Sequence, residues 1–139
     1  MLNINQGLLD RLTLRSRDHW PKEHGGILTG QITVERMFPL TNTSLNPFRF
    51  APDPTEVVNT LLQIEKEDLL PVASYHSHPS YDDTRKNPSK EDLDPRTNNA
   101  LGIIGPILVI ATPLDVWAFR SNALTMKGIK INGRWGGTP

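Results

Sequence analysis

The segment PVASYHSH, residues 71–78, is the feature that most limits how this chain can fold. Its pattern is typical of a β-strand, in which successive side chains point to opposite faces of a sheet. The predicted strand divides its side chains into two sets: Val72, Ser74, His76 and His78 on one face, and Ala73, Tyr75 and Ser77 on the other. The fold must therefore hold two imidazoles side by side on one face of a sheet.

The sequence upstream of this strand predicts a helix and then β structure. A helix is expected over residues 7–20, where Leu8, Leu9 and Leu12 form an apolar stripe before Pro21. Three β-type segments are expected to follow it: residues 25–34 (GGILTGQITV), 37–40 and 48–50.

The clearest helix start in the chain is DPTE, residues 53–56. Asp53 fits the N-cap, Pro54 fits the first helical position, and Glu56 fits the third position as a carboxylate form of the capping box. The face of this helix is expected to carry the following residues: Val57, Val58, Leu61, Leu62 and Glu65. The helix should end near residue 68 or 69, before Pro71.

The second half of the chain predicts a loop, a short helix and more strands. The expected segments are a polar loop at 79–88, a helix at 89–94 limited by Pro95, strands at 106–112 and 116–120 joined by a TPLD turn, and a last strand within 125–135. This order predicts an α/β (α+β) fold, with a mixed β-sheet packed between helices in one domain over residues 1–139.

Composition excludes several classes of function. The 139 residues suit one domain with a core, and the formal net charge of zero, without a run of Lys or Arg, argues against nucleic-acid or membrane partners. Cysteine is absent, so a metal would need His, Asp or Glu ligands. The N-terminus lacks a secretory signal, and the longest apolar run, of about twelve residues, is too short to span a bilayer. A soluble, cytoplasmic protein is expected.

His76 and His78 are a natural start for a zinc site, which is usually tetrahedral. A third ligand must come from the nearby carboxylates, which are Asp82, Asp83, Glu91, Asp92 and Asp94. Ser89 is a good N-cap that would fix Asp92 in the first turn of a helix, whereas Asp82 and Asp83 lie on a loop. The ligands His76, His78 and Asp92 would leave a fourth position for water, as catalytic zinc sites do.

Hydrolysis at such a site needs a base for the water and a donor for the oxyanion. Glu23 could be the base if its strand lies beside the histidine strand, and Ser89 could be the donor. Each piece alone has a plainer interpretation: an exposed histidine pair, a helix cap, a solvated glutamate, and tight packing at Gly25–Gly26. Their occurrence in one chain favours the catalytic interpretation.

These residues together resemble the JAMM (MPN-plus, or JAB-domain) zinc metallopeptidases. The family pattern is a Glu near a Gly-x-Leu-x-Gly stretch, then His-x-His-Pro, a spacer and Ser-x-x-Asp. The corresponding segments here are EHGGILTG with Glu23, HSHP at 76–79 and SKED at 89–92. The resemblance covers roughly residues 5–120, and the compact length is similar to that of prokaryotic stand-alone members.

The resemblance implies His76, His78 and Asp92 as Zn²⁺ ligands, with Glu23 as general acid/base and Ser89 as oxyanion stabiliser. It also implies a curved sheet of the JAMM/MPN (cytidine deaminase-like) type. Family substrates are peptide or isopeptide bonds, often after the C-terminal glycine of a ubiquitin-like or bacterial sulfur-carrier protein. Such a tail would lie extended beside a sheet edge.

The sequence departs from the family pattern in three places. The spacer between His78 and Ser89 is about three residues longer than the common form, which a loop can absorb at small entropic cost. Pro95 would shorten or bend the helix that carries Asp92. His24 stands where many stand-alone relatives have Cys, and it is expected to point to the strand face opposite Glu23, away from the metal.

Two other functions stay open. A non-catalytic MPN-type binding scaffold is one, although such members typically lose a ligand that this chain keeps. A RadC-like DNA-associated protein is the other, and the neutral charge weakens it. The sequence identifies neither the physiological substrate nor the oligomeric state.

Overall fold

A computed structural model describes residues 2–46, 49–78, 105–122 and 125–135 of the chain. The described elements are α1 (Gln6–Asp18), β1 (Gly25–Gly30), β2 (Val34–Leu40), α2 (Pro54–Lys66), β3 (Leu70–Ser77), β4 (Ile107–Ala111), β5 (Val116–Asn122) and β6 (Thr125–Ile129). Their strands form one sheet in the order β2-β1-β3-β4-β5-β6. The β3–β4 pair is parallel and the other pairs are antiparallel, so the predicted mixed sheet is confirmed.

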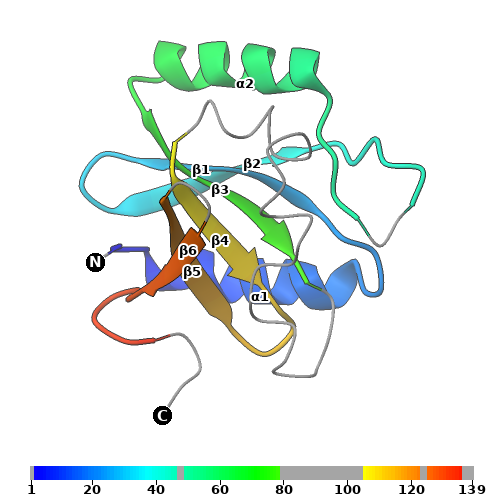
Figure 1. Cartoon of the computed structure of the whole chain (residues 1–139). Helices are drawn as coiled ribbons and strands as arrows, with labels where there is room; N and C mark the ends of the chain where they lie inside the picture. The colour runs from blue at the N-terminus through cyan, green and yellow to red at the C-terminus, as the bar shows by residue number, and fades with distance from the viewer. Residues whose placement is uncertain (1, 47–48, 79–104, 123–124, 136–139) are drawn as a thin grey trace.

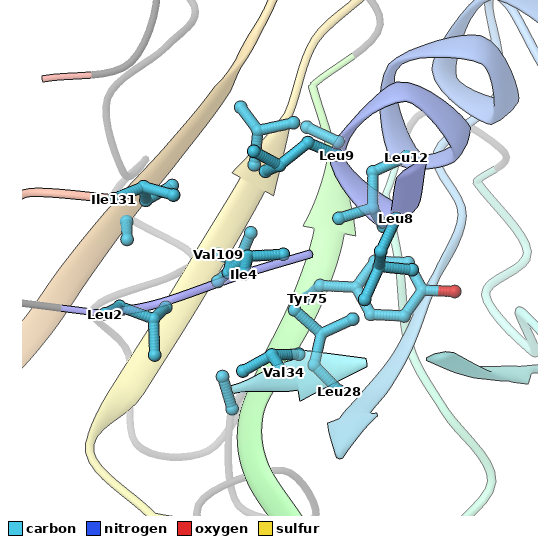
Figure 2. Close-up of a cluster of buried hydrophobic side chains, with 14 of the residues drawn as sticks. Leu2, Ile4, Leu8, Leu9, Leu12, Leu28, Val34, Tyr75, Val109 and Ile131 are labelled. Atoms are coloured by element: carbon cyan, nitrogen blue, oxygen red, sulfur yellow. The ribbon is translucent and has the colours of Figure 1, made fainter. Parts of the chain in front are cut away.

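The two helices lie on opposite faces of the sheet, as the sequence predicts (Figure 1). On the α1 face, Leu8, Leu9 and Leu12 pack toward Tyr75 and Val109 (Figure 2). On the α2 face, a smaller core contains Ile27, Leu40, Phe50, Val57 and Ile64. The sheet is therefore buried on both sides, and β3 lies near its centre between β1 and β4.

Helix α1 begins and ends close to the predicted bounds. The side chain of Asn5 accepts a hydrogen bond from Leu8 N, which satisfies one of the free N–H groups of the first turn. Arg17 lies in the last turn, and its Nε donates to Pro113 O at 2.7 Å. This bond ties the end of α1 to the turn between β4 and β5.

Helix α2 starts as predicted but uses one capping residue differently. The side chain of Asp53 accepts from Thr55 N, and Pro54 occupies the first helical position. The capping-box role predicted for Glu56 is wrong, because its Oε1 accepts from Thr41 N at 2.6 Å. Glu56 therefore joins α2 to the end of β2.

The predicted buried face of α2 is partly wrong. Val57 is fully buried, but Val58 and Leu62 are 49% and 54% exposed. Ile64, which the prediction left out, is fully buried. Residues 57, 61 and 64 follow the helical spacing of a single stripe, whereas residues 58 and 62 lie on the adjacent face.

The single strand predicted over residues 25–34 is wrong, because residues 31–33 form a tight turn between β1 and β2. A side chain at Gly30 would collide with Thr33 O, so this turn requires a residue without Cβ. The β-type stretch predicted near Phe50 is also wrong. Arg49 and Phe50 belong to an irregular connection between β2 and α2, where Phe50 is buried.

The predicted strands after residue 105 are confirmed, as is the TPLD turn. Thr112 Oγ1 accepts from the N–H groups of Leu114 and Asp115, and Thr112 N donates to Asp115 O. The loop and helix predicted over residues 79–94 lie outside the described residues. Among the described helices, none is long and apolar enough to cross a membrane.

Candidate metal centre

The C-terminal end of β3 brings two histidine rings together. His76 pairs with Gly25 of β1, and the main-chain N–H of His78 donates to Ala111 O at the end of β4. Both side chains are buried, at 4% and 2% exposure. Their Nε2 atoms lie 3.1 Å apart, with ring centroids at 5.0 Å. The predicted pairing of the imidazoles on one strand face is therefore confirmed.

Glu23, just before β1, lies at the same end of the sheet. It lies two residues before Gly25, so the antiparallel register places it opposite His78. Its side chain is partly buried. A carboxylate oxygen of Glu23 and one ring nitrogen each from His76 and His78 all lie within 4.8 Å of one another. Glu23 thus forms one polar group with two histidines that follow it by more than fifty positions.

The donor set fits a zinc ion. Two nitrogens that each bind one tetrahedral zinc at about 2.05 Å are about 3.3 Å apart. The observed 3.1 Å between the two Nε2 atoms is close to this value. Two imidazole nitrogens and a nearby carboxylate are also the ligand types that zinc prefers. His76 and His78 could therefore hold the metal, with Glu23 beside it.

The structure places three of the five predicted site residues. Glu23, His76 and His78 are brought together, whereas Ser89 and Asp92 lie outside the described residues. The competing carboxylates and Pro95 also lie outside them. The roles predicted for all five residues stay predictions, and only the proximity of Glu23, His76 and His78 is shown.

His24 lies on the opposite face of the sheet, as predicted. It is 5% exposed and contacts the rings of His19 and Tyr75, at centroid distances of 4.9 and 6.0 Å. Burial, reinforced by the nearby charges of His19, Arg15 and His76, lowers the pKa of His24 to about 3. Its ring is therefore neutral at physiological pH and belongs to the core beneath the site.

The two glycines after His24 let other groups approach the site closely. A Cβ on Gly25 would lie 2.6 Å from the Phe50 ring, and a Cβ on Gly26 would collide with Phe38 O and approach the Tyr75 ring. Tight packing at this Gly–Gly pair is therefore confirmed. Phe50 covers the backbone of β1 beside the metal group, a role that the sequence did not reveal.

Two polar side chains near Glu23 also went unrecognised in the sequence. Ser77 Oγ accepts from His24 N at 2.9 Å, while Ser77 N donates to His24 O at 2.8 Å. Asn42 Nδ2 donates to Glu23 O at 3.2 Å. Ser77 stands between the two histidines in the sequence, so strand alternation places its side chain on the opposite face. This position could have identified Ser77 as a neighbour of the site. Asn42 carried no signal, since its partners are distant in sequence.

A mixed sheet between two helices carries two histidines at the end of its central strand and a glutamate just before the neighbouring strand, an arrangement that points to the JAB/MPN class. Residues 5–122 match the family of prokaryotic homologs of the JAB domain. The chain therefore belongs to this family, and the resemblance predicted from the motif is confirmed.

Two named relatives share part of this sequence. A probable TtuB-protein conjugate cleaving protease from Thermus thermophilus is 35% identical over 80 residues, which are 57% of this chain and 54% of that protein. A CysO-cysteine peptidase from Mycobacterium tuberculosis is 30% identical over 96 residues, 67% of this chain and 64% of that protein. The match thus spans between about half and two thirds of these relatives.

Solved structures support the fold. A protein from Desulfitobacterium hafniense has a TM-score of 0.72 at 22% identity, with 94% of this chain and 91% of that chain covered. A JAB1/MPN domain protein from Archaeoglobus fulgidus has a TM-score of 0.58 at 17% identity, with 94% of each chain covered. These likenesses confirm the predicted JAMM/MPN fold class.

Proposed function

We propose that this protein is a zinc-dependent peptidase or isopeptidase that hydrolyses an amide bond after the C-terminal glycine of a ubiquitin-like or sulfur-carrier protein. The observation that carries the proposal is the convergence of Glu23, His76 and His78 within 4.8 Å in a chain of the JAB family. The names of the two relatives, which describe cleavage of a TtuB-protein conjugate and of CysO-cysteine, support this class of reaction.

His76 and His78 would hold the zinc ion together with Asp92 as the third ligand. Zinc supplies Lewis-acid chemistry at such a site, since it polarises a carbonyl and makes water nucleophilic at neutral pH. The burial of both histidines keeps bulk water away from their ring nitrogens. Each ring would then offer a nitrogen in a fixed direction, because the strand backbone and its neighbours hold it.

Glu23 would act as the general acid/base. Its carboxylate oxygen lies within 4.8 Å of the histidine nitrogens, so it could accept a proton from the attacking water. The same carboxyl group can then deliver that proton to the leaving amine. Ser89 would donate a hydrogen bond to the oxyanion as the carbonyl is attacked.

The outer edge of β2, beyond the bridge between Val34 and Ile4 at its start, offers a place for an extended substrate tail. Among the described strands, β2 pairs only with β1. Gly25 pairs with Leu40 at the end of β2 and with His76 of β3, so this edge leads to the end of the sheet where the histidines lie. A tail added there would gain main-chain hydrogen bonds and direct its C-terminal glycine toward the metal group.

The test is cleavage of a panel of C-terminally extended ubiquitin-like and sulfur-carrier proteins, with and without a chelator. We expect chelator-sensitive cleavage after the terminal glycine and about one zinc per chain. Glu23→Ala should retain zinc and lose cleavage. A folded protein that takes up no zinc would rule the proposal out, and one that binds zinc but cleaves nothing would favour a binding scaffold.

A further inference from the structure

The peptide unit between Glu23 and His24 lies just outside the paired part of β1. The registers of β1 with both neighbouring strands begin at Gly25, and the bond from Ser77 N to His24 O precedes them. The carbonyl oxygen of this unit accepts from Asn42 Nδ2 at 3.2 Å, and its N–H donates to Ser77 Oγ at 2.9 Å. Because a peptide unit is planar, holding both of its polar groups fixes its orientation and the Cα from which the Glu23 side chain extends.

The side chain of Asn42 uses its full hydrogen-bonding capacity. Its Nδ2 donates to Glu23 O and, at 2.6 Å, to Arg49 O. Its Oδ1 accepts from Ser44 N at 3.0 Å and from Ala51 N at 3.1 Å. An amide offers two donors and two acceptor sites, so only Asn in one orientation fits all four partners. Asn42 therefore joins the connection between β2 and α2 to the backbone of Glu23.

That same connection also packs against the site. Phe50 lies between the Asn42 partners Arg49 and Ala51, and its ring covers Gly25 on the face of β1 that carries Glu23. Movement of Asn42 would therefore release both the carbonyl of Glu23 and the wall beside it.

We propose that Asn42 and Ser77 are positioning residues that hold the Glu23 carboxylate toward the two histidines. We call Asn42, Ser77 and the peptide unit that they hold the clamp. The inference rests on the proposed function for the chemistry of Glu23, but the clamp itself is a property of the fold. Ser77 acts from β3, and Asn42 acts from the opposite side of the same peptide unit. Neither side chain needs to touch substrate or metal.

The test compares Asn42→Asp and Ser77→Ala with the wild type. Asn42→Asp keeps the acceptor oxygen but replaces the two donors with a second oxygen that faces two carbonyls. Ser77→Ala removes the acceptor for the buried N–H of His24. We expect kcat to fall about 10- to 100-fold with KM within about threefold, because a catalytic group misplaced by about 1 Å loses rate rather than binding. Zinc content should not change.

Two variants serve as matched controls. Thr43→Val removes the hydrogen bond from Thr43 Oγ1 to Ala51 O. This bond lies in the same connection between β2 and α2 but does not involve Glu23. Ser74→Ala makes the same substitution at another buried serine of β3, whose hydroxyl donates, among the described residues, to Ile107 O at 3.5 Å. We expect both controls to keep kcat within about threefold of the wild type.

Hydrogen exchange of the His24 amide gives a readout that does not depend on activity. We expect it to speed up about tenfold in Asn42→Asp and Ser77→Ala and to stay unchanged in the controls. If the wild type cleaved no substrate, the proposed function would fail, but the exchange rates would still show whether Asn42 and Ser77 hold the peptide unit between Glu23 and His24. Exchange rates equal to those of the controls, or equal losses of kcat in clamp and control variants, would overturn the inference. If one variant fails to fold, the other decides.

Discussion

The two faces of β3 carry neighbouring residues into different surroundings. On the α2 face, His76 meets Glu23 and His78 in a polar group whose atoms converge on one point. On the α1 face, Tyr75 is fully buried beside the leucines of α1 (Figure 2), and Ala73 is fully buried in the same cluster. Neighbouring side chains of β3 point to opposite faces of the sheet. One face therefore carries the polar atoms available for chemistry, and the other carries the apolar packing that holds the strand in place.

The largest expected effect is the loss of the metal when either histidine is removed. His76→Ala or His78→Ala should abolish zinc binding and cleavage, because each removes a ligand from a buried site. Zinc content by elemental analysis and cleavage rate are the measurements. Stoichiometric zinc in either variant would contradict the assignment of the metal site to the α2 face.

On the opposite face, Tyr75→Ala should damage stability rather than chemistry. The side chain is fully buried against α1, so its removal should lower the free energy of unfolding by about 3–5 kcal/mol. Urea unfolding of the chelator-treated protein measures this loss. Below the unfolding transition, the variant should still bind zinc through His76 and His78, and a loss of zinc without a loss of stability would contradict the separation of faces.

The buried His24 should make stability depend on pH. Its pKa is about 3 in the folded chain against 6.5 in the unfolded chain, so below pH 6.5 the unfolded chain binds the proton first. The contribution of the buried His24 ring to the free energy of unfolding is complete above about pH 6.5 and is lost as the pH falls toward 3. Between pH 7 and pH 5 the loss attributable to this ring should be about 2 kcal/mol.

The measurement for His24 is urea unfolding at both pH values in the metal-free protein. His24→Gln should remove the stated part of the pH dependence. His19→Gln, at the exposed ring that follows α1, should keep most of it, because burial lowers the pKa of His24 more than the charge of His19 does. An identical pH dependence in wild type and His24→Gln would show that this histidine does not titrate as its burial requires.

The smallest expected effect is that of Tyr75→Phe. The Tyr75 hydroxyl is buried without a hydrogen-bond partner among the described residues, and burial raises its pKa while the charge of Arg15 opposes the shift. Removal of the hydroxyl should therefore change stability by no more than about 1 kcal/mol and leave cleavage unchanged. A large fall in cleavage in this variant would show that the α1 face contributes to chemistry after all.

The features predictable from sequence were those written in short-range patterns. The period of β3 paired His76 with His78, and the Asp53–Pro54 signal located the start of α2. The family motif then added Glu23. Each of these needed only local geometry or a known order of residues.

The features missed from sequence depend on contacts between distant segments. Glu56 fits a capping box by position, but Thr41 N competes for its carboxylate. Asn42 has no local pattern, because its partner Glu23 is nineteen positions away. The turn after Gly30 was hidden by β-type residues that continue through it.

Anomalous scattering at the zinc edge, from crystals grown with zinc, tests the central claim most directly. We predict one strong peak at bonding distance, about 2.0–2.1 Å, from Nε2 of both His76 and His78, with Asp92 as the third protein ligand and Glu23 beside the metal. A fully folded protein with no peak at these two nitrogens, or with zinc bound only elsewhere, would contradict the account.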